Sequence, residues 1–188
     1  PLVLGEDPVD LQVWVRGGGD HRIDVWSRPA DVTGGVPWRL HASGQTGSLV
    51  EIADRLPHPG GRPVDPIRLR DVLRQRGVHY GDAFSGLESL SGGDGLACGR
   101  VRLPESLRRP HSAPRFRLHP AAVDAALHAL GGLDGPEGLN QDAAEAIERP
   151  EPLVEIPVAF DDIQLHRLPG EVMEVRAQRT EAGVRVEL

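Results

Sequence analysis

One segment near the middle of the chain constrains the fold more than any other. Residues 120–130 read Pro-Ala-Ala-Val-Asp-Ala-Ala-Leu-His-Ala-Leu and are followed by two glycines. Proline suits the first position of a helix, alanine and leucine are strong helix formers, and glycine ends helices, so these residues predict a helix. Ala122, Ala126 and Ala129 keep one side of this helix narrow, so a sheet can wrap closely around it.

The segments around this helix alternate apolar and polar residues with the period of two that is typical of strands. In the first 50 residues, runs at 11–15, 23–26 and 38–42 predict a hairpin followed by a third antiparallel strand. Further strands are expected at 96–103, 153–158, 162–166, 171–177 and 183–188. Runs of strands with few helices, and no alternation of strand and helix, predict an α+β fold.

A proline-rich stretch divides the chain. Residues 53–65 contain three prolines and two glycines, which leaves little room for regular structure, so we predict a linker there. Asp65 followed by Pro66 is a good helix start, and we predict a short helix at 66–76. The chain begins without Met, and its last alternating run stops in mid-pattern at Leu188, so we expect a piece of a longer polypeptide.

Composition and charge narrow the classes of function. The net charge is -7 and there is no basic stretch, so we expect no nucleic-acid partner. There is no apolar run long enough to span a membrane and no visible secretion signal, so we expect no membrane association. The single cysteine, Cys98, and scattered histidines predict no disulfide framework and no metal site, which fits a cytoplasmic protein.

Two residues of the predicted central helix can carry chemistry. Asp124 and His128 are four residues apart, so their side chains share one face and can touch. Asp124 lies among apolar residues, where loss of solvation should raise its pKa and suit it to be a general acid. The alternative is an ordinary surface pair, worth a few tenths of a kcal/mol. His119, just before the helix, can cap the helix or pack against it.

A second motif stands upstream. Residues 80–87 read Tyr-Gly-Asp-Ala-Phe-Ser-Gly-Leu and contain the only tyrosine of the chain. Gly81 and Gly86 would let the backbone approach another group closely. Taken alone, this motif predicts a turn and no chemistry.

Together, the two motifs resemble the dehydratase domains of modular polyketide synthases. The pattern of that family is Tyr-Gly-Pro-x-Phe-Gln-Gly-Leu, then His-Pro-x-x-x-Asp-x-x-x-Gln/His, and residues 80–87 and 119–128 follow it in order and spacing. Residues 1–4 and 38–44 also resemble late strands of the family's first half. The resemblance covers nearly the whole chain, and the motif with Asp124 is its most specific part.

The resemblance implies a double hotdog fold, in which two antiparallel sheets each wrap around a helix. Residues 1–52 would then be the C-terminal part of a first hotdog that is incomplete in this chain. Residues 53–65 would be the linker, and residues 66–188 the second hotdog, with 119–130 as its central helix.

The resemblance also implies an activity. Members of the family are hydro-lyases that remove water from a β-hydroxyacyl thioester held on an acyl carrier protein, giving an α,β-unsaturated acyl chain. Asp124 would be the general acid, and His128 would orient it. The remaining motif residues would contact substrate, namely Tyr80, Gly81, Phe84, Gly86, His119 and Pro120.

The implied partners are the acyl carrier protein and the neighbouring domains of the synthase, and a homodimer is expected because the parent synthases are dimers. No cofactor is implied beyond the phosphopantetheine arm of the carrier, to which the substrate is attached.

The chain departs from the family pattern in several places. The first-half signature His-x-x-x-Gly-x-x-x-x-Pro, whose histidine takes the α-proton, has no match, so we expect the catalytic base on a segment not present here. Asp82 and Ser85 replace the usual Pro and Gln, and a later Leu-Pro-Phe-x-Trp motif is altered at 156–160. Two alternatives therefore stay open: an inactive, structural or gatekeeping module, and a related cyclase or isomerase.

Overall fold

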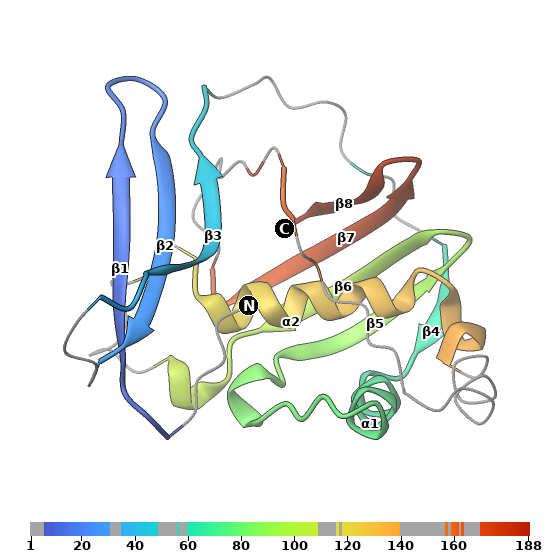
Figure 1. Ribbon diagram of the computed structural model, residues 1–188. Helices are drawn as coiled ribbons and strands as arrows, with labels where there is room; N and C mark the ends of the chain where they lie inside the picture. The colour runs from blue at the N-terminus through green and yellow to red at the C-terminus, as the bar shows by residue number, and fades with distance from the viewer. Residues whose placement is uncertain are drawn as a thin grey trace. The chain divides into compact units, whose positions relative to one another are not determined.

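The computed structural model describes residues 6–30, 35–48, 60–108, 118–139 and 170–188, together with residues 56, 116, 157, 159–161 and 163. The chain divides into two compact units, Pro1–Ile52 and Ala53–Leu188. In the described residues each unit holds one antiparallel sheet, and the helices belong to the second unit (Figure 1). The predicted α+β class is confirmed.

The first unit is a three-stranded sheet in the order β1-β2-β3. Its strands are β1 (Val9–Arg16), β2 (Arg22–Pro29) and β3 (Arg39–Gln45), and both neighbouring pairs are antiparallel. The predicted hairpin and third strand are therefore confirmed. Residues 1–4, which resembled a family strand, lie outside the described residues.

One face of β1 is apolar and exposed. Its alternate residues Val9, Leu11, Val13 and Val15 are 36%, 56%, 55% and 59% exposed. Val13 pairs with Val25 of β2, so the apolar face continues onto the next strand. Exposed apolar patches that run over neighbouring strands commonly mark surfaces that another element covers.

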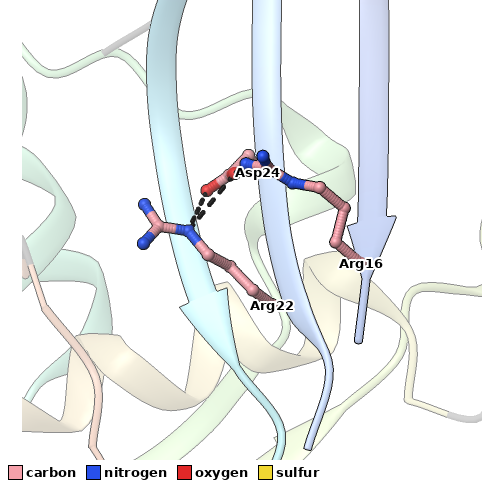
Figure 2. A network of polar contacts seen from close by, with 3 residues as sticks. All are labelled: Arg16, Arg22 and Asp24. Carbon is pink, nitrogen blue, oxygen red and sulfur yellow. Dashed lines mark hydrogen bonds and ion pairs between the residues drawn. The ribbon is translucent and has the colours of Figure 1, made fainter. Parts of the chain in front are cut away.

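The opposite face of this sheet carries a charged network (Figure 2). Asp24 of β2 is fully buried, and its carboxylate accepts hydrogen bonds from the guanidinium groups of Arg16 and Arg22. The Arg22 Nε atom lies 3.0 Å from Oδ1 of Asp24. Arg16 first, and then Arg22, hold the pKa of the Asp24 carboxyl below its ordinary value, against the opposing effect of burial.

The second unit is built on a five-stranded sheet in the order β4-β5-β6-β7-β8, with every neighbouring pair antiparallel. The strands are β4 (Arg62–Val64), β5 (Leu87–Gly93), β6 (Leu96–Arg102), β7 (Val172–Thr180) and β8 (Gly183–Glu187). Although β7 comes much later in the chain than β6, the two strands lie side by side in the sheet (Figure 1).

Two strands of this sheet were not expected. Residues 62–64 were assigned to the linker 53–65, but they form β4 and pair with β5, so the linker prediction is wrong for its last residues. The Ser- and Gly-rich strand β5 lacks the apolar alternation that would have predicted it. Of the strands expected at 153–158 and 162–166, the structure describes only residues 157 and 163, and neither is in a strand.

Helix α1 (Pro66–Gln75) confirms the helix predicted at 66–76. The side chain of Asp65 accepts a hydrogen bond from the N–H of Ile67 at 2.8 Å, which caps the helix as expected. Gly77, at a φ of 86°, ends it in a conformation that glycine adopts without strain. A single 3₁₀ turn, η1 (Asp82–Phe84), then leads into β5.

The predicted central helix is α2 (Pro120–Leu127), which continues as the 3₁₀ segment η3 (His128–Gly132). Another 3₁₀ turn, η2 (Glu105–Leu107), follows β6. In Figure 1, α2 lies along the five-stranded sheet. Ala122, Ala126 and Ala129 are at most 7% exposed, so the predicted narrow face is confirmed. This alanine face forms one hydrophobic core with residues of the sheet, including Leu90, Ala97, Val101, Val175 and Ala177.

Glycines let the end of the helix approach the sheet. A methyl group on Gly92 of β5 would lie 2.8 Å from the carbonyl carbon of Gly132. A methyl group on Gly131 would lie 2.6 Å from a terminal carbon of Leu69 in α1. Both distances are too short for real carbon contacts. A larger residue at Gly92 would push η3 away from the sheet, and a larger residue at Gly131 would have to displace the Leu69 side chain of α1.

We expect Gly92→Ala to destabilise the second unit, by about 1–3 kcal/mol, because the added methyl group meets backbone that cannot move independently. Urea unfolding followed by circular dichroism measures this loss. Tryptophan fluorescence is an internal reference, since all three tryptophans lie in the first unit. Gly60→Ala is the matched control, because nothing lies within 4 Å of the added methyl group. Equal stability of the two variants would contradict the close approach.

A second prediction concerns the Asp24 network. Because the pKa of Asp24 is lowered in the folded state, its contribution to stability is present above the unfolded pKa and is lost as pH falls through the folded pKa. We expect Asp24→Asn to lower the urea midpoint of the first unit at neutral pH and to flatten its fall below about pH 4. Tryptophan fluorescence gives both quantities. The exposed turn residue Asp20, replaced by Asn, should behave as wild type.

Candidate active site

Asp124 of α2 and His128, where α2 passes into η3, lie one helical turn apart. Nε2 of His128 lies 3.3 Å from Oδ2 of Asp124. The His128 side chain is only 6% exposed, and that of Asp124 is 36% exposed. The histidine of the pair is thus buried, whereas the aspartate is partly exposed to solvent.

The two facing atoms have no hydrogen-bond partner. In the part of the chain that the structure describes, Oδ2 of Asp124 and Nε2 of His128 are among four buried side-chain atoms that lack one. Their 3.3 Å separation suits an ion pair, but the groups are not aligned for a hydrogen bond. Unsatisfied buried polar atoms are rare in proteins, and catalytic hydrogen bonds are often long before substrate binds.

Tyr80 contacts the histidine of this pair. Its ring packs edge-on against the ring of His128, with 4.4 Å between the ring centres. The ring of Phe84 lies 6.4 Å from that of Tyr80. Burial first, and then the negative charge of Asp124, raise the pKa of the Tyr80 hydroxyl. Tyr80 and Asp124 are therefore electrostatically coupled.

The two glycines of the Tyr80 motif differ in how closely other parts of the protein approach them. A methyl group on Gly86 would lie 2.7 Å from the carbonyl oxygen of Arg102 and 3.3 Å from Cβ of Ala125 in α2, so Gly86 allows the expected close approach. Gly81 has no atom within 4 Å of such a methyl group, so the same expectation is wrong there. The carbonyl of Gly81 instead accepts the N–H of Phe84 and starts η1.

His119 and Pro120 form the start of α2. Nδ1 of His119 accepts a hydrogen bond from the N–H of Ala121 at 3.2 Å, and Pro120 is the first helical residue. Phe116 packs edge-on against the His119 ring at 5.3 Å. No sequence motif includes Phe116, and its only sequence signal is its position three residues before His119.

A pocket of about 190 Å³ lies next to this cluster, between α1 and η1. Tyr80, Gly81 and Ser85 line it on one side, and Asp124 is not among its lining residues. Its other wall comes from α1, where Arg70 and Arg74 are balanced by Asp71 and by Asp82 of η1, so the pocket has no excess charge. The described residues therefore do not place Asp124 in this pocket.

Within the described ranges, no group of three or more His, Cys, Asp or Glu side chains could hold a metal ion. No helix in those ranges is both long and apolar enough to cross a membrane.

A family model described as "Polyketide synthase dehydratase N-terminal domain" matches residues 53–186. The chain belongs to the polyketide synthase dehydratase family. It is 33% identical over 188 residues to the spectinabilin polyketide synthase system protein NorA of Streptomyces orinoci. That match covers 96% of this chain and 9% of NorA.

Solved dehydratases share the fold. A dehydratase studied for substrate selection in the borrelidin and fluvirucin synthases is 29% identical, with a TM-score of 0.69, and the match covers 98% of this chain and 62% of that one. A bifunctional dehydratase-cyclase domain of ambruticin biosynthesis is 28% identical, with a TM-score of 0.63 and coverage of 90% and 57%. The fold is thus the expected double hotdog, and the chain spans about three fifths of these dehydratases. The assignment of 1–52 and 66–188 to the two hotdogs stays a prediction.

The cluster around Asp124 yields a prediction that needs no enzyme assay. Tyr80 is the only tyrosine, so the ultraviolet absorbance of tyrosinate reports on this residue alone. We expect Asp124→Asn to lower the pKa of Tyr80 towards its ordinary value, because one of the two causes of its raised pKa is removed. Asp134→Asn is the control, since Asp134 pairs with Arg179 elsewhere on the surface. An unchanged Tyr80 pKa in Asp124→Asn would contradict the coupling.

Proposed function

We propose that this chain supplies the acid side of a dehydratase active site. The substrate is a β-hydroxyacyl thioester. Asp124 gives a proton to the leaving hydroxyl, the carbon–oxygen bond breaks, and water departs. A base removes the α-proton, and the electrons of that carbon–hydrogen bond form the new double bond. The base is a histidine that we expect on a part of the dehydratase outside these 188 residues.

The Asp124–His128 pair is the observation that carries this proposal. A general acid needs a carboxyl oxygen that can hold a proton and is not already committed to a protein donor. Oδ2 of Asp124 is buried beside His128 and accepts no hydrogen bond, while the side chain as a whole is 36% exposed, so the carboxyl group remains open to a substrate. The neighbouring imidazole is buried and packs against the ring of Tyr80. His128 can then orient the carboxyl group without being the group that delivers the proton.

The surrounding residues suit a supporting role. Tyr80 and Phe84 offer aromatic surface beside the pair, and Gly86 lets β5 begin directly against α2. We propose that Tyr80, Gly81, Phe84 and Gly86 form part of the wall along which the acyl chain lies. The departures at Asp82 and Ser85 fall at this wall, where they would affect which acyl chain is accepted.

The proposed partner is an acyl carrier protein, whose phosphopantetheine arm holds the substrate. Removal of water needs a base and an acid but no electron carrier, so we propose no further cofactor. The relatives are large multidomain synthases, of which this chain spans a small part, so we also propose that it acts beside other synthase domains, in a homodimer.

Cyclisation is the second candidate, favoured by the likeness to the ambruticin dehydratase-cyclase domain. The α,β-unsaturated thioester made by dehydration can be attacked at its β-carbon by a hydroxyl group further along the same chain. That step conserves mass, so it leaves the loss of one water as the only mass change. Chromatography of the released product separates the cyclic ether from the open chain.

We expect Asp124→Asn to abolish dehydration by a dehydratase domain that contains this chain, with a loss of about 100- to 10,000-fold in rate. The amide has the shape of the acid but cannot deliver the proton. The assay follows the loss of one water from a β-hydroxyacyl carrier by mass spectrometry. His128→Ala should cost less, because it removes the orienting group and leaves the acid.

The matched control is Asp134→Asn, which changes an exposed carboxylate that pairs with Arg179. It should dehydrate at the wild-type rate. If Asp124→Asn folds as wild type and stays within about threefold of its rate, Asp124 is not the acid.

A further inference from the structure

The first turn of α2 depends on a single residue. The first N–H groups of a helix have no partner within the helix, and Pro120 has no N–H at all. The N–H of Ala121 donates to Nδ1 of His119 at 3.2 Å. The N–H groups of Ala122 and Val123 donate to the carbonyl oxygen of His119, at 2.9 and 3.1 Å. His119 therefore supplies the acceptors for the first three N–H groups of the helix.

Water is a poor substitute for this histidine. Ala121 and Ala122 are only 4% and 7% exposed, because this end of α2 is packed into the second unit. A buried N–H that loses its partner loses more than an exposed one, which water can satisfy. The usual residues at a helix start are Ser, Thr, Asp and Asn, and His119 performs their function with a ring nitrogen.

The ring of His119 is fixed in place. Phe116 packs edge-on against it at 5.3 Å, and the backbone of His119 is extended, as the following proline requires. Nδ1 of the ring points at the first turn of the helix, where it accepts the Ala121 N–H. The nitrogen that faces the helix is thus occupied and cannot bind substrate.

We propose that His119 is a positioning residue, which anchors the start of α2 and thereby places Asp124 without touching the substrate. This inference rests on the proposed function, in which Asp124 delivers the proton. Asp124 is the fifth residue of an eight-residue helix. If the first turn unfolds, the residues directly before Asp124 lose their helical conformation. The proposal replaces the expectation, drawn from the family resemblance, that His119 contacts substrate.

The test compares His119→Ala with His119→Asn. The side-chain oxygen of Asn can accept the Ala121 N–H, whereas Ala offers no acceptor. In the dehydratase domain that contains this chain, we expect His119→Ala to lower kcat about tenfold with KM nearly unchanged, and His119→Asn to recover most of the loss. Hydrogen exchange of the Ala121 amide should be fast in the Ala variant and slow in the Asn variant.

His21→Ala is the control, since it removes an exposed histidine from a turn of the first unit. If His119→Ala does not fold, His119→Asp replaces it: folding and turnover of the Asn and Asp variants support the cap. A raised KM with unchanged kcat would overturn the proposal, because it would show that the ring binds substrate. So would an Asn variant that protects the Ala121 amide and is nevertheless as slow as the Ala variant.

The amide exchange experiment also separates this inference from the proposed function. It is made on the 188-residue chain and needs no activity. If Asp124→Asn retains dehydration, the proposed function fails, and with it the catalytic consequence of the cap. If instead the Ala121 amide exchanges equally fast in wild type and His119→Ala, the cap fails while the role of Asp124 stands.

Discussion

The second unit depends on how closely α2 and its continuation η3 approach the sheet. Alanines line the side of the helix that contacts β5, β6 and β7. At the closest approach, Gly92 of β5 lies against Gly132 of η3, so both backbones carry a glycine there. Small residues give little apolar area each, but they let backbone pack against backbone with few voids. The helix positions that are not taken by these alanines include those of Asp124 and His128, so the packing of the helix also determines where this pair lies.

The site follows from that geometry. His128 lies at the junction of α2 and η3, where its side chain is buried with Nε2 3.3 Å from Oδ2 of Asp124. Tyr80 comes from the loop after α1 and closes over the histidine. The helix thus supplies the acid and its neighbour, while a loop distant in sequence supplies the aromatic contact and contributes to the electrostatic environment.

Much of this arrangement could be predicted, for identifiable reasons. The spacing of Asp124 and His128 predicts their contact because helix geometry is local, and Asp65-Pro66 marks the start of α1 for the same reason. The strand β4 was missed because Pro63 suggests a linker, and only its pairing with β5 makes the segment regular. The packing of Tyr80 on His128 joins residues far apart in sequence, so no local pattern could have predicted it. The roles of these residues came from the family resemblance and remain proposals.

The first unit has a different consequence. Its sheet has one face joined by ion pairs around Asp24 and another on which four aliphatic side chains of β1 are exposed. β1 is also an edge strand, so its outer backbone groups have no strand partner in the described sheet. An unpaired edge strand next to an exposed apolar face can pair with strands of other chains as well as with strands of its own chain. The concentration at which a preparation of this polypeptide remains monomeric will therefore be governed by these few residues of β1.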